Sequence, residues 1–410
     1  MEVILRCCAG LDVHKDGVEA CVRRTSAGGK VEHEVRHWGT TTRELAEMSN
    51  WLSSLRVTHV AMESTGVYWK PIFNILEEHF EILLANAQHL KNVPGRKTDI
   101  RDCQWIAQLL QHGLLKGSFI PPRPQRELRD LTRQRTQLVD EASRISNRIQ
   151  KVLEDANVKL GSVASNVVGA SGRLMLEAIV AGQDDPSQLA DLAKRRLRGK
   201  IPQLEQALDG KLTEHHRWML GLLLDQWKST QLFIARLDER IAERTRPQQA
   251  VLEKLDAIPG VDRRVAEVLL AEIGPDVTPF PTHAHLASWA GICPGNNESA
   301  GKKRSSKTTK GSRWLRQALV QAAWAASHKK DSYFQAHARN LMHRRGRKRG
   351  LVAVAHSLLT VIYHMLKEDT SYHDLGSQFL DRLRAKHLVR FHVRRLQNLG
   401  LQVTLTPETA

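Results

Sequence analysis

Residues 97–108 read KTDIRDCQWIAQ, a helix start that carries two acids. Thr98 or Asp99 can cap the helix, whose apolar face follows at helical spacing with Ile100, Trp105, Ile106, Leu109 and Leu110. Asp99 and Asp102 are three residues apart, so a helix brings both carboxylates to one side of one turn. Two like charges this close are tolerated at a solvated helix start or around a cation. Alone, the pair indicates ordinary capping; two further acids at the right places would indicate a metal site.

The chain before this helix alternates between strand and helix signals. Three apolar or alternating runs come first, the last two split by the turn signal Ser-Ala-Gly-Gly, and they predict a three-stranded meander. Thr42 is expected to cap the next helix. The expected elements are strands at 4–12, 17–25, 30–38, 58–62 and 81–86, with helices at 42–55, from 66 to about 79, and from 98. This β-β-β-α-β-α-β-α order is the ribonuclease H arrangement, an α/β fold.

The predicted order of strands and helices suggests a common role for four acids. Asp12 lies on the first strand, Glu63 ends the fourth, and Asp99 and Asp102 open the helix after the fifth. In this arrangement such positions converge at one end of the sheet, where four carboxylates hold one or two Mg²⁺ ions, or Mn²⁺ in their place. Ions so placed stabilise the attacking and leaving oxygens of a phosphodiester. Each acid by itself is more often a strand-end or cap residue, so the prediction rests on all four.

Residues 33–37 read HEVRH and match the H-E-x-x-H pattern of zinc proteases. That chemistry needs a helix, so that both histidines share a face. Here the five residues lie in an alternating run after Gly28-Gly29, which predicts a strand. We therefore expect His33 and His37 to be surface residues and not zinc ligands.

The composition points to a polyanionic partner. The 410 residues carry 61 Lys and Arg against 44 Asp and Glu, a net charge of +17, and nucleic acid is the usual polyanion for such a chain. The hydrophobic content of 41% suits two or three globular domains, with no stretch long enough to span a bilayer and no secretory signal. Five cysteines without a C-x-x-C pair support neither a disulfide framework nor a zinc ribbon. We expect a cytoplasmic protein that does not bind membranes.

Two long helices are predicted beyond Pro121-Pro122. Apolar residues recur in steps of three and four from Leu128 to Val152, a heptad-like pattern that favours one arm of a coiled coil. A second periodic run, from Leu220 to Ile241, is its antiparallel return or an oligomerisation helix. Shorter helices are expected near 174–180 and 189–197, in a weakly patterned insert to which we assign no role. Simple scaffolding and contact with protein or nucleic acid both remain open for the long helices.

A Pro-Gly turn between two helical segments follows. Ile258-Pro259-Gly260 precedes a helix over 265–273, which is the pattern of a helix-hairpin-helix. Turn amides and the second helix N-terminus of such a hairpin hold a DNA phosphate, which makes Gly260 a candidate nucleic-acid contact. The same hairpin serves equally often for packing alone.

A glycine- and asparagine-rich loop within residues 289–316 presents Ser299 ahead of Ala300-Gly301. Cations that could neutralise phosphates surround it: Lys302, Lys303, Arg304, Lys307, Lys310, Arg313 and Arg316. A serine hydroxyl is a poor nucleophile until a base, a cation or a metal activates it. From the pattern alone, Ser299 is an ordinary phosphate contact. A second basic run lies at 343–349, before an apolar helix at 351–366, and a basic tail follows.

Taken together, these motifs resemble one known family. They are Gly10-Leu11-Asp12, Glu63-Ser64-Thr65-Gly66, Lys97-Thr98-Asp99 with Asp102, Ile258-Pro259-Gly260, Gly291-Ile292-Cys293-Pro294, Glu298-Ser299-Ala300-Gly301 and Lys310-Gly311. In this order, over about residues 6–366, the chain resembles the bridge-RNA-guided DEDD transposases of bacterial insertion sequences. The resemblance implies a RuvC-like DEDD domain (1–120), a coiled-coil connector with an insert (121–250), a transposase domain with a helix-hairpin-helix and a catalytic serine (251–366), and a basic tail (367–410).

The resemblance also assigns roles. It makes Asp12, Glu63, Asp99 and Asp102 the Mg²⁺ ligands and Ser299 a nucleophile that forms a covalent phosphoserine link with DNA. It implies donor DNA, target DNA and a non-coding bridge RNA as partners, and a homo-oligomer, dimer or tetramer, in which one subunit's acids meet another's serine. A bacterial, nucleoid-associated location follows. Ser305 and Ser306 also lie in the loop, so the choice of Ser299 depends on the Glu-Ser-Ala-Gly match.

Two other functions fit part of the pattern. A metal-dependent nuclease of the Holliday-junction type would use water as the nucleophile, with the serine only binding phosphate. A non-catalytic nucleic-acid-binding protein would account for the net charge of +17 alone.

Overall fold

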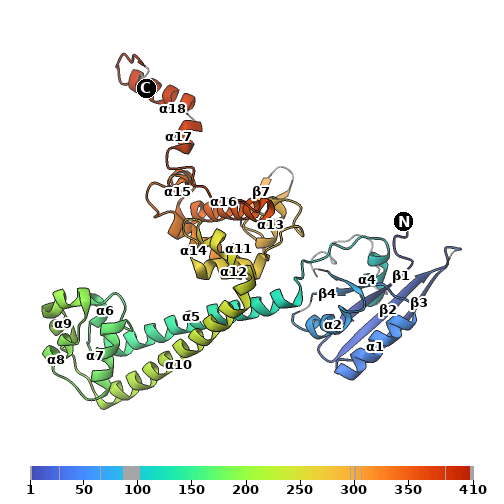
Figure 1. The fold of residues 1–410 in the computed structure, drawn as a ribbon, viewed down its shortest axis with the longest axis horizontal. Helices are drawn as coiled ribbons and strands as arrows, with labels where there is room; N and C mark the ends of the chain where they lie inside the picture. The colour runs from blue at the N-terminus through green and yellow to red at the C-terminus, as the bar shows by residue number, and fades with distance from the viewer. Residues whose placement is uncertain are drawn as a thin grey trace. The chain divides into compact units, whose positions relative to one another are not determined.

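The computed structural model describes residues 2–26, 28–64, 66–85, 102–295, 297–299, 302–305, 307–383 and 385–406. Contacts divide the chain into two compact units, Met1–Pro121 and Pro122–Ala410 (Figure 1). The first unit holds a mixed sheet with helices. The second is largely helical in its described residues. The predicted boundaries at residues 250 and 366, which separate the connector, the transposase domain and the basic tail, remain predictions.

The first unit is built on a five-stranded sheet of order β3-β2-β1-β4-β5. Its strands are β1 (Cys7–Val13), β2 (Gly17–Thr25), β3 (Val31–Gly39), β4 (His59–Glu63) and β5 (Glu81–Ala85). The first three pair antiparallel, whereas β4 and β5 continue the sheet in parallel with β1. The predicted mixed sheet is therefore confirmed, and its order agrees with a ribonuclease H-like fold.

Helices cover both faces of this sheet. Side chains alternate along β1, so Ala9, Leu11 and Val13 pack with α1 (Thr42–Ser54) and α2 (Trp69–Leu76), whereas Cys8 packs under α4 (Asp102–Gln111). The predicted cap of α1 was one residue late: Thr41, not Thr42, accepts the hydrogen bond from the Glu44 amide. The extended backbone of Thr41 lets its side chain turn back over the first helical turn.

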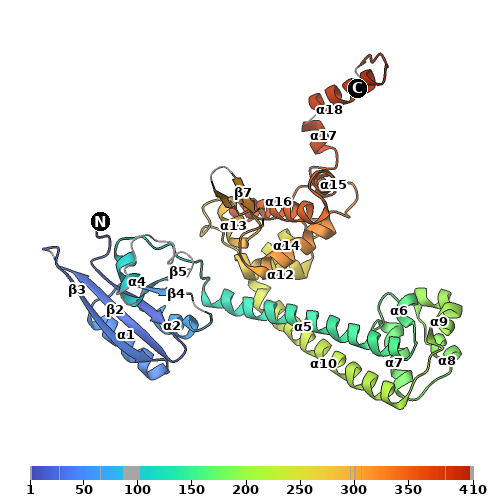
Figure 2. The ribbon, with the colours of Figure 1, turned by 180° about the vertical axis from the view of Figure 1, so that it is seen from behind.

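Two long helices, α5 (Arg123–Asp155) and α10 (Glu214–Thr245), begin the second unit and run side by side (Figures 1 and 2). Ion pairs join the start of each helix to the end of the other, which makes the pair antiparallel: Asp155–His216, Arg135–Asp238 and Glu127–Arg244. The antiparallel return is confirmed, whereas coiled-coil packing and an oligomerisation role stay predictions.

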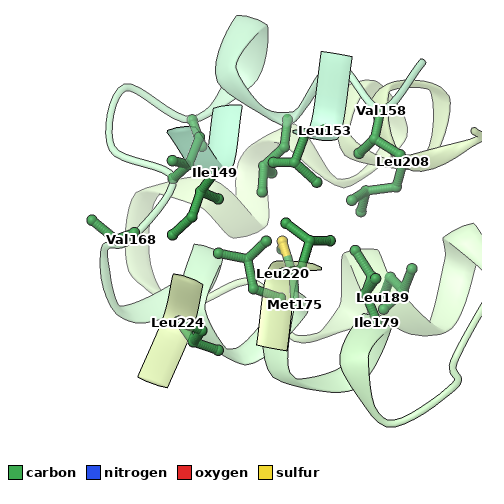
Figure 3. Packing of buried hydrophobic residues seen from close by; sticks show 14 of the residues in the cluster. Ile149, Leu153, Val158, Val168, Met175, Ile179, Leu189, Leu208, Leu220 and Leu224 are labelled. Carbon is green, nitrogen blue, oxygen red and sulfur yellow. The ribbon is translucent and has the colours of Figure 1, made fainter. Parts of the chain in front are cut away.

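The insert between the long helices shares a hydrophobic core with the adjoining ends of both helices. It contains α6 (Leu160–Val163), α7 (Ala170–Val180), α8 (Pro186–Asp191), the 3-10 helix η1 (Arg195–Lys200) and α9 (Ile201–Leu208). In Figure 3, Met175 of α7 lies beside Leu220 of α10 and Ile179 of α7 lies beside Leu189 of α8, in the same cluster as Ile149 and Leu153 of α5. The helix expected at 189–197 is broken, because α8 ends at Asp191 and η1 begins only at Arg195. We call this part, residues 156–213, the helical cap.

The remaining helices form the C-terminal part of the second unit. They are α11 (Gln249–Asp256) after the short η2 (Arg246–Gln248), α12 (Arg263–Ile273), α13 (His283–Ala290), α14 (Arg313–Ala326), α15 (Tyr333–Arg345) and α16 (Arg347–Glu368). A small hairpin, β6 (Asn297–Ser299) and β7 (Lys302–Ser305), lies between α13 and α14 in sequence. The tail carries α17 (Phe379–Leu383) and α18 (Ala385–Asn398), neither of which buries a residue.

One helix corrects the expectation that no stretch could span a bilayer. Among the described residues, α16 is long and apolar enough by length and composition to do so. Its apolar residues Val354, Leu358 and Ile362 are buried, and the helix packs against α14 and α15. A core helix of a globular domain needs the same composition, which explains the match.

Candidate active site

The register of the sheet brings Asp12 next to Glu63. Leu11 of β1 is the partner of Met62 in the parallel β4. Asp12 and Glu63 each follow these partners by one residue, at the carboxyl ends of neighbouring strands about 4.8 Å apart. Alternation along both strands turns the two acids toward the face that α4 covers. Two of the four predicted acids therefore lie side by side on one face of the sheet.

Asp102 is the first residue of α4, the helix that covers this face. The helix comes very close to β1, because a Cβ at Gly10 would overlap the backbone of Cys103 and Ala107. Cys103 and Ala107 are buried with Cys21 of β2. Glycine at position 10, two residues before Asp12, thus holds the start of α4 against the strand that carries the first acid.

The full quartet lies beyond what the structure describes. Asp99 is outside the described residues. Within the described parts of the chain, no three His, Cys, Asp or Glu side chains are close enough together to hold a metal ion. The carboxylate oxygens of Asp12, Glu63 and Asp102 are the donors that Mg²⁺ prefers, and the shared face suits such an ion. The four-acid metal site therefore remains a prediction.

Two neighbours of Asp12 escaped the sequence reasoning. His14 Nε2 lies 3.1 Å from Asp12 Oδ2, and Glu19 is the register partner of Asp12 on β2. The tight β1–β2 turn that creates both contacts is closed by the bond from the His14 amide to the Gly17 carbonyl, 2.9 Å. The predicted strands at 4–12 and 17–25 indicated a tight turn here, but the register that pairs Val13 with Val18, and so Asp12 with Glu19, comes from the structure.

Residues 33–37, which match the zinc-protease pattern, lie in the strand β3, as expected. His33 and His37 pair with Arg23 and Glu19 across β2 and β3. Four residues along a strand span about 13 Å, so the two imidazoles are too far apart to share one zinc ion.

Ser299 is the last residue of β6 and pairs with Lys302, the first residue of β7. The hairpin turn between them, Ala300-Gly301, lies outside the described residues. A register irregularity separates Asn297 from Glu298. Such bulges redirect the end of a strand and occur often beside active sites.

The segments before β6 and after β7 are also joined by backbone hydrogen bonds. The Gly295 amide donates to the Lys307 carbonyl at 2.8 Å, and the Thr309 amide donates to the Cys293 carbonyl at 3.2 Å. Gly291 and Gly311 then meet so closely that a Cβ on either would overlap the backbone of the other. We call residues 291–295 and 307–312 the hairpin base. It connects the end of α13 to the start of α14.

The predicted phosphate-binding cations are spread over the hairpin and its base. Lys302, Lys303 and Arg304 belong to β7, where the structure describes only their backbone. The other four cations differ in exposure: Lys307, Lys310 and Arg313 are exposed, whereas Arg316 is half-buried and donates to Thr308 Oγ1 at 3.3 Å. All lie between residues 302 and 316, where Arg313 and Arg316 already belong to the first turn of α14, and contact with phosphate remains a prediction for each.

Gly260 has a structural role that its predicted phosphate contact did not require. It adopts a φ of +84°, and a Cβ there would overlap the backbone of α14 at Ala322 and Ala326. The Pro-Gly turn between α11 and α12 therefore packs on α14. This contact explains the glycine fully, while phosphate binding by the turn stays a prediction.

The cysteines are poorly suited to act as nucleophiles. Burial raises the pKa of Cys293, at the hairpin base, above its usual value. Burial also raises the pKa of Cys8 and of Cys21 to about 12. A thiol with a raised pKa is protonated and unreactive near neutral pH.

Comparison with known proteins gives a match for the region of the four acids and another for the region of Ser299. Residues 9–158 match the IS110 DEDD transposase domain, described as a transposase, and residues 252–339 match the domain described as "Transposase IS116/IS110/IS902 family". The first match contains all four predicted acids, and the second contains Gly260 and Ser299. The chain carries both transposase domains of this family. It is therefore a DNA transposase or recombinase.

Individual proteins that resemble this chain support this conclusion. An uncharacterised 43.6 kDa protein of insertion element IS110 from Streptomyces coelicolor is 28% identical over 310 residues, 68% of this chain and 73% of that protein. An uncharacterised 44.8 kDa protein of insertion element IS116 from Streptomyces clavuligerus is 23% identical, over 70% of this chain and 78% of its own. A pilin gene-inverting protein of Moraxella bovis is 30% identical over 121 residues, 29% of this transposase and 37% of the Moraxella protein.

Proposed function

We propose that this transposase cleaves and exchanges DNA strands in a Mg²⁺-dependent reaction with Ser299 as the nucleophile. The observation that carries the proposal is the pair Asp12 and Glu63 at neighbouring strand ends, in a chain that also presents a serine at the end of a hairpin strand. Carboxylates suit a divalent cation, and a serine followed in the chain by a run of cations suits a phosphodiester.

The proposed chemistry conserves phosphodiester bonds. Ser299 Oγ attacks a backbone phosphorus and forms a phosphoserine bond, while one phosphorus–oxygen bond of the strand breaks. The serine proton leaves to a base, and the released strand end takes up a proton to become a free hydroxyl. A hydroxyl of the second strand then attacks the phosphoserine, which restores the serine and joins the new strand. Each exchange replaces one phosphorus–oxygen bond with another, so strands are exchanged without an energy source.

The acids would hold the cation. Asp12, Glu63, Asp99 and Asp102 are the proposed ligands of Mg²⁺, with Mn²⁺ as a substitute, and the bound ion would supply positive charge beside the reacting phosphate. His14 is placed to orient Asp12 through its hydrogen bond.

The partners follow from the family resemblance. We propose that donor and target DNA bind to the cations Lys302, Lys303, Arg304, Lys307, Lys310, Arg313 and Arg316, and that Gly260 lies at a further backbone contact. A bridge RNA selects both DNA sequences by base pairing. The acids of one subunit act with the serine of another in a dimer or tetramer. Such a protein would work at the nucleoid of a bacterial cytoplasm.

The test is a reaction of the purified transposase with labelled donor DNA, target DNA and the RNA transcribed beside its gene. We expect recombinant junctions together with a protein–DNA adduct that resists denaturation, and Ser299→Ala should abolish that adduct. Ser305→Ala and Ser306→Ala are the controls, and both should retain it. An adduct that survives in Ser299→Ala refutes the assignment of the nucleophile.

The same experiment separates the alternatives. A nuclease that activates water would cleave without an adduct, would be sensitive to Asp102→Asn, and would hardly respond to Ser299→Ala. A non-catalytic binding protein would give neither cleavage nor adduct, even when all four acids are intact.

A further inference from the structure

A buried carboxylate lies next to the hairpin base. The side chain of Glu272, near the end of α12, is fully inaccessible to solvent. Two arginines of α5 surround it: Arg133 binds both carboxylate oxygens, at 2.7 and 2.9 Å, and Arg129 Nε lies 3.8 Å from Oε2. The third partner of Glu272 is Ser312, whose Oγ donates to Oε2 at 3.1 Å. Groups from three helical segments thus meet at one charge.

The first turns of α5 also cap the C-terminus of α12. Gln125 Nε2 and Arg129 Nε donate to the Ala271 carbonyl at 3.1 and 3.0 Å, and Arg129 donates to the Glu272 carbonyl as well. Gln125, Arg129 and Arg133 are four residues apart and share one face of α5. A carboxylate at the negative end of a helix is unfavourable by itself, and burial adds to the cost. The arginines offset both terms, so this geometry is strongly specified.

Ser312 connects the buried charge to the hairpin base. It is the N-cap of α14 and accepts from the Leu315 amide at 3.3 Å while it donates to Glu272. Its neighbour Gly311 lies against Gly291, where the two strands of the hairpin base begin. A direct series of contacts therefore runs from Arg133 through Glu272 and Ser312 to the segments that carry β6 and β7.

Aromatic rings complete the same contact. The Arg129 guanidinium lies 5.5 Å from the ring centre of Trp289, and that of Arg133 lies 6.0 Å from Trp314. Trp289 is in the last turn of α13 and Trp314 in the first turn of α14, so the rings flank the hairpin base in sequence. Burial lowers the pKa of Arg129 to about 10, which still leaves it charged at neutral pH.

We propose that Glu272 is a positioning residue that sets the serine hairpin on the first turns of α5. The proposal rests on the function proposed above for Ser299. The N-terminal unit ends at Pro121, and α5 follows it directly. Gln125, the first of the three α5 residues that contact the end of α12, is therefore only four positions beyond the unit boundary. A movement of these turns would be passed to the hairpin base through the Glu272 carboxylate, alongside the contacts of Arg129 with Trp289 and of Arg133 with Trp314.

The chain offers a matched control for this residue. Glu267 is also on α12, is also almost fully buried, and also binds two arginines, Arg263 at 3.0 Å and Arg264 at 2.9 Å. Both of those arginines belong to α12 itself. Glu267→Gln therefore removes a comparable charge without touching the contact between α5 and the hairpin base.

The first measurement compares strand cleavage with DNA binding in the full-length protein. We expect Glu272→Gln to slow formation of the protein–DNA adduct by about 10- to 100-fold, since small misplacement of a reacting group costs that much. The affinity for labelled donor DNA should change less than about twofold, and Glu267→Gln should leave both quantities near the wild-type values. Equal slowing in the two variants would overturn the proposal.

The second measurement uses Ser312. Ser312→Ala should slow adduct formation, whereas Ser312→Thr, which keeps the hydroxyl, should restore most of the rate. Because Glu272 and Ser312 act through one contact, the double variant Glu272→Gln/Ser312→Ala should be little slower than the worse single variant. Fully multiplicative effects would mean that the two residues act separately, against the proposal.

Hydrogen exchange separates failure of this inference from failure of the proposed function. The Gly295 and Thr309 amides are protected by the hairpin base and should exchange faster in Glu272→Gln than in Glu267→Gln. This readout does not depend on Ser299 chemistry. Unchanged exchange together with normal adduct formation overturns the positioning role, whereas an adduct that persists in Ser299→Ala overturns only the nucleophile. A thermal scan confirms that each variant is folded.

Discussion

Gly10 of β1 lies directly against the backbone of Ala107 in α4, with no room for a side chain between them. The contact fixes the helix that begins at Asp102 on the strand that carries Asp12. The alignment of two predicted metal ligands thus depends on a residue with no chemistry of its own.

Gly10→Ala should destabilise the first unit. The added methyl must push α4 away from β1, and overpacking of this kind costs about 1–3 kcal/mol. Urea unfolding followed by circular dichroism measures the change. Gly28→Ala is the control, because no described heavy atom lies within 4 Å of a Cβ there, and its effect should stay within about 0.5 kcal/mol. Equal stability of the two variants would contradict the close contact.

Asp12→Asn should reduce Mg²⁺-dependent strand cleavage by at least about 100-fold, because the carboxylate is a proposed ligand of the ion that stabilises the reacting phosphate. The folded state should be little affected, since the Asp12 side chain is partly exposed and its partner His14 is itself exposed. Cleavage rates against Mg²⁺ concentration provide the measurement. Asp16→Asn, in the exposed turn of the same hairpin, should behave like the wild type.

Cys8 and Cys21 should make the first unit sensitive to alkaline pH. Burial raises the pKa of each thiol from 9.0 to about 12. The unfolded chain therefore loses these protons first, so the stabilising contribution is complete below about pH 9 and declines as the pH rises toward 12. Unfolding free energies measured from pH 8 to 11 should fall, and less steeply in Cys8→Ala relative to its own value at pH 8. Rapid alkylation of Cys8 in the native protein at pH 8 would argue against the burial.

Ile149→Ala should loosen the helical cap. Ile149 is fully buried in the core that the cap shares with α5 and α10, and loss of such a side chain costs about 2–5 kcal/mol. The exposed Leu222 of α10, 53% accessible, is the control, and Leu222→Ala should change the stability by less than about 0.5 kcal/mol. Thermal unfolding reports both changes. A small effect of Ile149→Ala would mean that the cap does not contribute to the stability of the long helices.

Much of the first unit could be anticipated from local pattern. The strand 17–25 was predicted to the residue, and the strand assignment of His33 and His37 removed the zinc alternative. The helical insert was anticipated only in part, because weak periodicity at 189–197 did not reveal the break between α8 and η1. Gly260 was singled out correctly as a special position, but its contact with α14 could not be foreseen, since the two lie about 60 residues apart in sequence.

Alternation and helical spacing are properties of neighbouring residues, so the chain itself specifies the strands of the sheet, the two long helices and the positions of the four acids proposed to bind metal. Contacts between distant segments obey no such period. The approach of α4 to Gly10 and the charge of Glu272 between Arg133 and Ser312 depend on how whole elements pack, and packing selects one arrangement among many that the same local pattern allows.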